Sequence, residues 1–351
     1  MKIAVVAGGT GGHIYPAITL AEKLKERSHE VVFFGSNDRM EKTLVPQYGF
    51  EFIGMDIKTT AGGIIDKAKS LISLIDGYFK SRKLLKGFDM VIGFGNYISY
   101  PLVMAGSHLG LKTAIHEQNS FAGKANRALD SHVDLVIGCY EENLKQFKNP
   151  HTLILGNPQS GKAISAENDP EVIRSFGLDP DKKTLVIFMG SLGSKSVNET
   201  LLKYFDLCDG SYQIIYAAGK AYYEEAKKAV DKDYIRIEER IDGAKVMKNS
   251  DLLLCRAGAT TLCEIAAMGM PSIIIPSPYV PNNHQFYNAK ALTDKNAAVM
   301  IEEKDLTAEK LYDKVNELIN DDEKLKELSE NAGKLSNPKV LDDIVEALEK
   351  L

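Results

Sequence analysis

A cluster of glycines near the start of the chain, followed at once by a histidine, is the arrangement best suited to chemistry. Residues 8–13 read Gly-Gly-Thr-Gly-Gly-His, after the apolar run 3–6 and before an amphipathic helical pattern over 17–27. Glycines between a buried strand and a helix let the backbone turn sharply and approach a ligand closely. An imidazole has a pKa near roughly 6.5 in water, so His13 at the mouth of this helix is a candidate general base.

The spacing of these glycines differs from that of two common nucleotide loops. It matches neither Gly-x-Gly-x-x-Gly nor Gly-x-x-x-x-Gly-Lys-Ser/Thr, which disfavours a plain dinucleotide site and an ATP-type phosphate loop. The segment alone leaves open a purely structural alternative, a glycine-rich connection in which His13 only starts the helix.

Two segments of the second half carry similar turns after predicted strands. Residues 190–194, Gly-Ser-Leu-Gly-Ser, can hold a phosphate oxygen through backbone amides and the Ser191 hydroxyl, or form only a tight connection. Residues 255–267 predict a helix N-terminus at 258–261, where the macrodipole suits a pyrophosphate. Glu264 can accept hydrogen bonds from two ribose hydroxyls; the alternative is an acid placed there by the helix dipole.

A proline-rich loop followed by amide side chains comes next. Pro276, Pro278 and Pro281 stiffen it, and residues 282–288 begin Asn-Asn-His-Gln. Amides both donate and accept hydrogen bonds, which suits sugar hydroxyls. Helix capping by one of the two asparagines is an alternative that is compatible with binding.

Composition limits the class of protein. The 351 residues are enough for two domains, and 44% hydrophobic with 26% charged residues is typical of a globular protein. The net charge of −5 gives no general attraction to nucleic acid, so we expect no nucleic-acid partner. Four scattered cysteines without a Cys-x-x-Cys pair predict reduced, buried thiols rather than disulfides or a zinc site. The start leaves no room for a signal peptide and no run of 18 apolar residues occurs, so we expect a cytoplasmic protein.

Short apolar runs alternate with helical patterns along the whole chain. Alternation of this kind predicts an α/β fold with two doubly wound parallel sheets. The predicted strands are 3–7, 31–35, 90–93, 113–116, 135–138 and 153–155 in the first half, and 184–189, 213–217, 235–238, 252–255 and 272–275 in the second. Gly156-Asn157-Pro158 is a natural boundary, and a final helix over about 340–351 can pack back on the first half.

Taken together, these motifs resemble the MurG family of peptidoglycan N-acetylglucosaminyltransferases. The resemblance covers essentially the whole chain and rests on segments in the family's order: 8–16, 37–41, 93–99, 116–119, 156–158, 190–194, 255–267 and 283–289. It implies a glycosyltransferase-B fold, in which two Rossmann-like domains face a central cleft. Residues 1–157 with the helix 338–351 would form the acceptor- and membrane-facing domain, and 158–337 the donor-binding domain. The implied substrates are UDP-N-acetylglucosamine and lipid I, an undecaprenyl-pyrophosphoryl-muramoyl peptide.

The resemblance also implies site residues, with His13 as the base. The implied substrate-binding positions are Thr10, Gly11, Gly12, Asn119, Ser191, Ile241, Ala259, Thr260, Thr261, Leu262, Glu264 and Gln285. Further positions beside them are Tyr97, Gly190, Gly193, Arg256, His284 and Asn288. In this assignment Ile241 meets uracil through its backbone, Glu264 binds the ribose and Gln285 the sugar hydroxyls.

The sequence departs from the family pattern at two places. Gln159 and Ser160 follow Gly-Asn-Pro where the family usually has an arginine, and Lys162 is the nearest cation. Asn96 stands where a glycine usually follows Gly95.

The implied reaction is an inverting transfer to the muramoyl C4 hydroxyl. Glycine turns and a helix N-terminus can stabilise the leaving UDP. The Asp-x-Asp elements 179–181 and 231–233 precede predicted strands and read as turns, so we expect no metal and no cofactor.

A lipid-linked acceptor requires contact with a membrane. Residues 58–90 carry seven Lys/Arg and three Asp, a local charge of +4 in an acidic protein. This amphipathic segment can lie on an anionic leaflet, which would place the protein at the inner face of the bacterial cell membrane. The alternative is a buried amphipathic helix with a solvated outer face.

Two other classes of function remain open. A UDP-N-acetylglucosamine 2-epimerase shares the two-domain architecture, but would leave the Gly-Gly-His turn and the basic segment unexplained. A non-catalytic nucleotide-sugar binding protein would be expected to lack His13 or Glu264.

Overall fold

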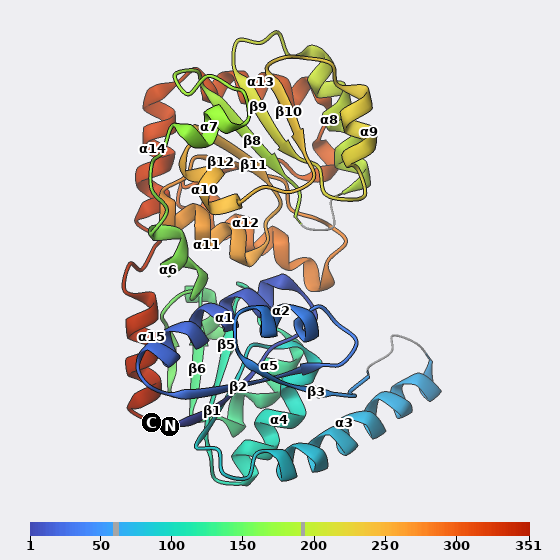
Figure 1. Cartoon of the computed structure of the whole chain (residues 1–351), viewed down its shortest axis with the longest axis vertical. Helices are drawn as coiled ribbons and strands as arrows, with labels where there is room; N and C mark the ends of the chain where they lie inside the picture. The colour runs from blue at the N-terminus through green and yellow to red at the C-terminus, as the bar shows by residue number, and fades with distance from the viewer. Residues whose placement is uncertain (59–62, 191–193) are drawn as a thin grey trace. The chain divides into compact units, whose positions relative to one another are not determined.

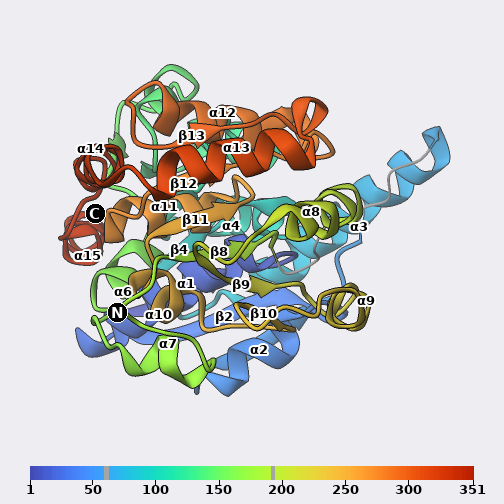
Figure 2. The same cartoon turned by 90° about the horizontal axis from the view of Figure 1, so that it is seen from above.

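The computed structural model describes residues 1–58, 63–190 and 194–351 and consists of two compact units (Figures 1 and 2). The first unit contains residues 1–161 and 339–351, and the second contains residues 162–338. Each unit is built around one parallel sheet, which confirms the predicted α/β class with two doubly wound sheets.

The first sheet has seven parallel strands in the order β3-β2-β1-β4-β5-β6-β7. Their bounds are β1 Lys2–Val6, β2 Glu30–Ser36, β3 Glu51–Met55, β4 Met90–Gly93, β5 Lys112–Glu117, β6 Leu135–Gly138 and β7 Thr152–Ile154. The order reverses between β1 and β4, so the turns after these two strands meet at one place on the carboxyl edge.

Helices cover both faces of this sheet because successive side chains of a strand point to opposite sides. Ile3 and Val5 belong to the core under one helical layer, and Ala4 and Val6 to the core under the other. The first layer consists of α1 (Gly11–Glu26), α2 (Glu41–Gln47) and α15 (Val340–Glu349). The second consists of α3 (Ile64–Leu84), α4 (Asn96–His108) and α5 (Lys124–Leu129), with η1 (Asp130–His132) and η2 (Glu141–Lys145) following.

Helix α15 returns to the first unit from the other end of the sequence. Its buried residues Val340, Ile344 and Leu348 join the core that α1 covers. Asp342 of α15 also pairs with Lys23 at 3.0 Å and with Arg27 at 3.2 Å. The first unit therefore takes one of its core helices from residues beyond the second unit.

The second sheet has six parallel strands in the order β10-β9-β8-β11-β12-β13. Their bounds are β8 Thr184–Phe188, β9 Gln213–Ala217, β10 Ile235–Glu238, β11 Leu252–Cys255, β12 Ser272–Ile274 and β13 Val299–Met300. The main core of this unit lies under α8 (Lys195–Leu207), α9 (Tyr223–Ala229), α13 (Ala308–Ile319) and α14 (Asp322–Gly333). Helix α6 (Gln159–Ile164) crosses the division between the two units. The remaining helices of the second unit are α7 (Glu171–Ser175), α10 (Gly243–Lys248), α11 (Ala259–Met268), η3 (Pro281–Asn283), α12 (His284–Thr293) and η4 (Glu303–Asp305).

The structure corrects three expectations. Helix α1 begins at Gly11 rather than near Ala17, because the amides of His13 and Ile14 both donate to the Thr10 carbonyl and close the first turn through the glycines. Strands β3 and β13 were not predicted; both are edge strands, and β13 has only two residues. All four cysteines are free thiols as predicted, but Cys139 and Cys263 are only half-buried.

Candidate functional site

In both units, predicted site residues follow the carboxyl ends of central strands. In the first unit, residues 8–13 follow β1 and Asn119 follows β5. In the second, Gly190 follows β8 and residues 256–264 follow β11. This edge is where open parallel sheets bind ligands, because turns from neighbouring strands gather there.

The glycine turn of the first unit places His13 in the first turn of α1. The Thr10 hydroxyl lies 2.9 Å from His13 Nδ1, so the ring is held from its own turn. On its other side the imidazole approaches Gly95, where a Cβ atom would lie 3.5 Å from Nε2. Gly95 has a φ of +79°, a conformation that favours glycine. The ring is half-buried, and its tautomer decides which nitrogen accepts a proton.

Two side chains from other elements hold the start of this turn. Asn96 Nδ2 donates to the Gly8 carbonyl at 2.9 Å, while the Gly9 amide donates to Glu41 Oε2 at 3.3 Å. Glu41 is fully buried and also accepts from the Ser36 amide at 2.9 Å. The first residue of α4 therefore holds the turn on one side, and the first residue of α2 holds it on the other.

A second buried carboxylate organises the loop after β5. Glu117 accepts hydrogen bonds from the amides of Asn119 at 3.0 Å and Gly123 at 2.8 Å, and from Asn126 Nδ2 at 2.9 Å. Burial raises the pKa of Glu117, while these donors act in the opposite direction. Asn119, a predicted sugar contact, is thus positioned by its own neighbouring acid.

The carboxyl edge of β5 also contains buried polar atoms without partners in the described part of the chain. They are His116 Nδ1, Gln118 Oε1 and Asn126 Oδ1. His116 stacks on Phe94 with ring centroids 5.1 Å apart, and burial lowers its pKa to about 4, so it is neutral at pH 7. Unpartnered buried acceptors are costly, so this edge is suited to an ordered water or a polar ligand.

The second unit has an open cavity of about 820 Å³ at the carboxyl edge of its sheet. It is lined by Phe188, Met189, Gly190, Ser194, Lys195, Ser196, Glu199, Arg256, Gly258, Thr261, Ser277, Tyr279, Val280 and Gln285. Four positions predicted from the sequence therefore share one cavity: Gly190, Arg256, Thr261 and Gln285.

Arg256 is the buried cation of this cavity, and its charge is compensated. Its Nη2 lies 2.6 Å from Glu303 Oε2 and donates to the Ser194 hydroxyl at 2.5 Å. Glu303 Oε1 in turn accepts from Ser196 Oγ at 2.5 Å, and Arg256 Nη1 donates to the Ile275 carbonyl at 3.1 Å. The ion pair thus joins the end of β11 to η4, and the hydrogen bonds of Arg256 add Ser194 and the end of β12.

Helix α11 begins directly after β11, at the position predicted from the sequence. Gly258 is its N-cap, and Ala259, Thr260 and Thr261 are its first three residues, whose amides have no acceptor one turn earlier in the helix. The Leu262 amide donates to the Gly258 carbonyl at 3.0 Å, and its side chain is buried. The Thr260 hydroxyl is buried with no partner in the described residues.

Glu264 lies further along α11 and is half-buried. It lies near the buried Cys255 thiol: burial, and secondarily the charge of Glu264, raises the pKa of that thiol. Along the helix, Glu264 follows the first three residues, Ala259–Thr261, by about one turn.

The loop after β12 is held by Gln285, whose Oε1 accepts from the Ser277 amide at 2.8 Å. Asn283 is the N-cap of α12 but makes no side-chain capping bond, which contradicts that alternative for Asn283. His284 Nδ1 lies 2.8 Å from the Pro281 carbonyl oxygen. The side chain of Asn288 is buried, and its Nδ2 donates to the Ala257 carbonyl at 3.2 Å.

The remaining predicted positions lie outside these clusters or outside the described residues. Ile241 is half-buried in the connection between β10 and α10. Tyr97 is half-buried in α4, and its amide donates to Asn96 Oδ1 at 2.6 Å. Ser191 and Gly193 belong to 191–193, which lie outside the described residues.

The corner without the family arginine is occupied by an uncharged contact. Gln159 Oε1 accepts from the Thr19 hydroxyl of α1 at 2.9 Å, and the Ser160 amide donates to the Asn157 carbonyl. This chain thus uses Gln159 to fix the start of α6 on the first unit.

Helix α3 has an exposed apolar stripe. Leu71, Ile72, Ile75 and Phe79 are exposed by 58%, 66%, 48% and 58% respectively. Other residues of the helix, including Leu74 and Tyr78, pack against the core that α4 covers. One face of α3 therefore packs on the first unit, while its outer face exposes four apolar side chains. No helix in the described residues has the length and apolar character needed to cross a membrane.

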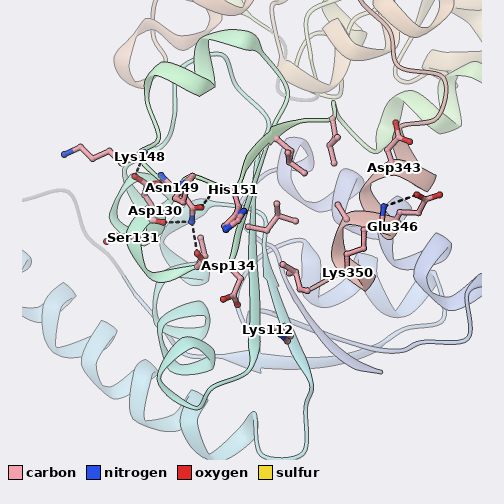
Figure 3. A pocket seen from close by; sticks show the side chains of 17 residues that line it. Lys112, Asp130, Ser131, Asp134, Lys148, Asn149, His151, Asp343, Glu346 and Lys350 are labelled. Atoms are coloured by element: carbon pink, nitrogen blue, oxygen red, sulfur yellow. Dashed lines mark hydrogen bonds and ion pairs between the residues drawn. The ribbon is translucent and has the colours of Figure 1, made fainter.

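A second large cavity, of about 960 Å³, lies in the first unit at the amino edge of its sheet, opposite the edge that carries the glycine turn (Figure 3). Its walls are formed by the amino ends of β5, β6 and β7 and by the face of α15 that carries Glu346 and Lys350. Asp130 lies in its wall, and each of its carboxylate oxygens accepts a hydrogen bond from a backbone amide, that of Lys148 or of Asn149. No residue predicted for the site lines it.

Comparison with known proteins defines the class. Residues 3–137 match the glycosyltransferase family 28 N-terminal domain, and residues 184–344 match the family 28 C-terminal domain. A protein of Bacillus thuringiensis (strain Al Hakam) is 36% identical over 362 residues, covering 100% of this chain and 99% of that protein. It is named UDP-N-acetylglucosamine–N-acetylmuramyl-(pentapeptide) pyrophosphoryl-undecaprenol N-acetylglucosamine transferase 2.

Solved structures agree. The crystal structure of Acinetobacter baumannii MurG superposes with a TM-score of 0.80 at 26% identity, covering 100% of this chain and 99% of that one. A Listeria monocytogenes protein named putative UDP-N-acetylglucosamine 2-epimerase has a TM-score of 0.71 at 14% identity, covering 99% of this chain and 96% of that one. It shares the fold alone. The chain therefore belongs to the MurG family within glycosyltransferase family 28.

Within the described residues, no group of three or more His, Cys, Asp or Glu side chains is arranged to hold a metal ion. The polar groups described at the two carboxyl edges include backbone amides, amide side chains and the ion-paired Arg256.

Proposed function

We propose that this protein transfers N-acetylglucosamine, with inversion, from UDP-N-acetylglucosamine to the C4 hydroxyl of the muramoyl unit of lipid I, giving lipid II. The observation that carries the proposal is the cavity of the second unit. It gathers the glycine turn after β8, the N-terminus of α11 and Gln285, in a chain that matches these transferases along its full length.

Residues 158–337 are proposed to bind the donor. The free amides of Ala259–Thr261 would receive the diphosphate, with the unpartnered Thr260 hydroxyl beside them. Glu264 would accept hydrogen bonds from the ribose, and Gln285 would bind the sugar. Ile241 would contact uracil through its backbone, and Ser191 a phosphate.

Residues 1–157 and 338–351 are proposed to bind the acceptor and to carry the base. His13 would take the proton from the C4 hydroxyl as that oxygen attacks the anomeric carbon and the bond to UDP breaks. Thr10, Gly11 and Gly12 would receive the acceptor pyrophosphate, and Asn119 the transferred sugar. The reaction would need no metal, because amide donors would stabilise the charge on UDP.

The exposed stripe of α3 is proposed to bind the membrane that holds lipid I. Its four apolar side chains lie on a helix that also carries Lys67, Lys69, Arg82 and Lys83, all exposed. Apolar burial together with attraction to anionic lipid would hold the protein at the inner face of the bacterial cell membrane.

One assay distinguishes this proposal from its rivals. Purified protein is incubated with radiolabelled UDP-N-acetylglucosamine, with and without a short-chain lipid I analogue. We expect label in the lipid only when the analogue is present. Conversion of the nucleotide sugar to its 2-epimer without acceptor would identify an epimerase, and binding with neither product would identify a non-catalytic protein.

A further inference from the structure

Two side chains that the proposed chemistry does not use meet at the start of the glycine turn. Asn96 is the first residue of α4, and Glu41 is the first residue of α2. Both contact the backbone of Gly8 and Gly9, only a few residues before His13.

Asn96 joins the two turns that enclose the imidazole. Its Nδ2 donates to the Gly8 carbonyl at 2.9 Å, and its Oδ1 accepts from the Tyr97 amide at 2.6 Å. The preceding residue, Gly95, packs against His13. The turn that carries the imidazole and the turn that borders it are therefore connected by one amide side chain.

The backbone of Asn96 has a conformation that asparagine tolerates better than most residues. Its φ is +65°, in the left-handed region where glycine is favoured and asparagine is tolerated. The family usually has glycine here, which would satisfy the backbone but could make no bond to Gly8. The Asn96 side chain also lies close to Gly9, because a Cβ atom on Gly9 would lie 2.1 Å from Asn96 Nδ2.

Glu41 holds the opposite side of the same two glycines. It is fully buried, and a Cβ on Gly8 would lie 2.4 Å from its Oε1. Its two oxygens accept from the Ser36 and Gly9 amides, which ties the turn to the end of β2. Gly9 itself has a φ of +91°, a conformation that glycine adopts readily and other residues rarely do.

We propose that Asn96 and Glu41 are positioning residues that fix the glycine turn, and through it the orientation of His13. In this chain the Asn96 side chain donates a hydrogen bond to Gly8 that a glycine at this position could not make. The functional half of this inference rests on the proposed function, since it assigns His13 the role of base.

The test is Asn96→Gly, which restores the usual family residue, keeps the left-handed backbone and removes only the side-chain contacts. Because one neutral hydrogen bond to the turn is lost, we expect kcat for transfer to fall about 3- to 10-fold, with KM for UDP-N-acetylglucosamine within about twofold. The Gly8 and Gly9 amides should exchange hydrogen faster in the variant.

Two further variants separate positioning from general stability. Asn296→Gly changes another left-handed asparagine, in the second unit, and should leave kcat and the exchange of Gly8 and Gly9 as in the parent. Asn96→Asp keeps the acceptor for Tyr97 but loses the donor to Gly8, so its kcat should fall at least as far as that of Asn96→Gly.

The outcomes are distinct. Unchanged kcat and unchanged exchange at Gly8 and Gly9 in Asn96→Gly would overturn the inference, as would an equal fall in Asn296→Gly. If the parent shows no transfer to lipid I, the proposed function fails, while amide exchange alone still decides whether Asn96 fixes the turn.

Discussion

The carboxyl edges of the two sheets differ in how their polar groups are satisfied. In the first unit the turn backbones are held by the buried carboxylates of Glu41 and Glu117 and by the half-buried Asn96, and His13 is half-buried at the edge. In the second unit the edge opens into a cavity of about 820 Å³ with free helix amides and an ion-paired Arg256. This difference supports the proposal that the first edge holds the base and that the second edge binds the donor.

The largest effect should come from removing the group that the first edge holds. Replacing His13 with alanine should lower kcat by about 10²–10⁴ while donor affinity changes little, because only proton transfer is lost. Steady-state kinetics and UDP binding by calorimetry measure the two effects. His132→Ala, an exposed histidine of the same unit, is the control. A His13→Ala variant within about threefold of the parent would remove His13 from this role.

The second edge should respond in binding rather than turnover. Glu264→Gln loses charge-assisted hydrogen bonds to the ribose, so we expect KM for UDP-N-acetylglucosamine to rise about 10- to 100-fold. Glu225→Gln, an exposed acid of the same unit, should leave KM unchanged. A Glu264 variant with the donor affinity of the parent would place the ribose elsewhere.

Acid should destabilise the first edge through His116. Burial lowers the pKa of His116 to about 4 in the folded protein, whereas the pKa in the unfolded chain is near 6.5. The unfolded chain therefore binds a proton first as the pH falls, and the free energy of unfolding decreases between about pH 6.5 and pH 4. The loss should reach about 2 kcal/mol at pH 5. Glu117 acts in the opposite direction, because its pKa is raised and its native form takes up a proton first.

Urea unfolding of the parent and of His116→Gln between pH 7.5 and 5 isolates the histidine, since Glu117 is common to both proteins. We expect the parent to lose more stability than the variant over this range. Parallel pH dependences would show that His116 does not titrate in this way.

The smallest effect concerns α3, which belongs to the first unit alone. Phe79→Ser removes one exposed aromatic ring, so binding to vesicles with anionic lipid should weaken about 5- to 10-fold. Leu144→Ser, also exposed in the first unit but in η2, is the matched control. Sedimentation with vesicles at low salt measures both, and failure of the parent to bind would refute the membrane role of α3.

The sequence predicted the elements well where a single strand or helix carries the signal. Apolar runs located every strand except β3 and β13, which lie at sheet edges and need little hydrophobic pattern of their own. The glycine turn was recognised, but the start of α1 was missed because hydrogen bonds to Thr10 outweigh the low helix propensity of glycine.

Supporting residues were harder to predict than the candidate site residues themselves. Glu41 and Glu303 lie far in sequence from the groups they hold, and only tertiary structure brings them together. Glu117 was the one such acid with a local signal, since it ends β5 directly before Gln118 and Asn119.

The return of α15 to the first sheet has a consequence for biosynthesis. A ribosome releases residues 1–161 long before it makes the helix that shields part of their apolar interior. During that interval the first unit must wait partly uncovered, so a chaperone or a slow step in translation would have its effect there. Expression of residues 1–161 alone should give an aggregation-prone fragment that a co-expressed 339–351 peptide helps to rescue.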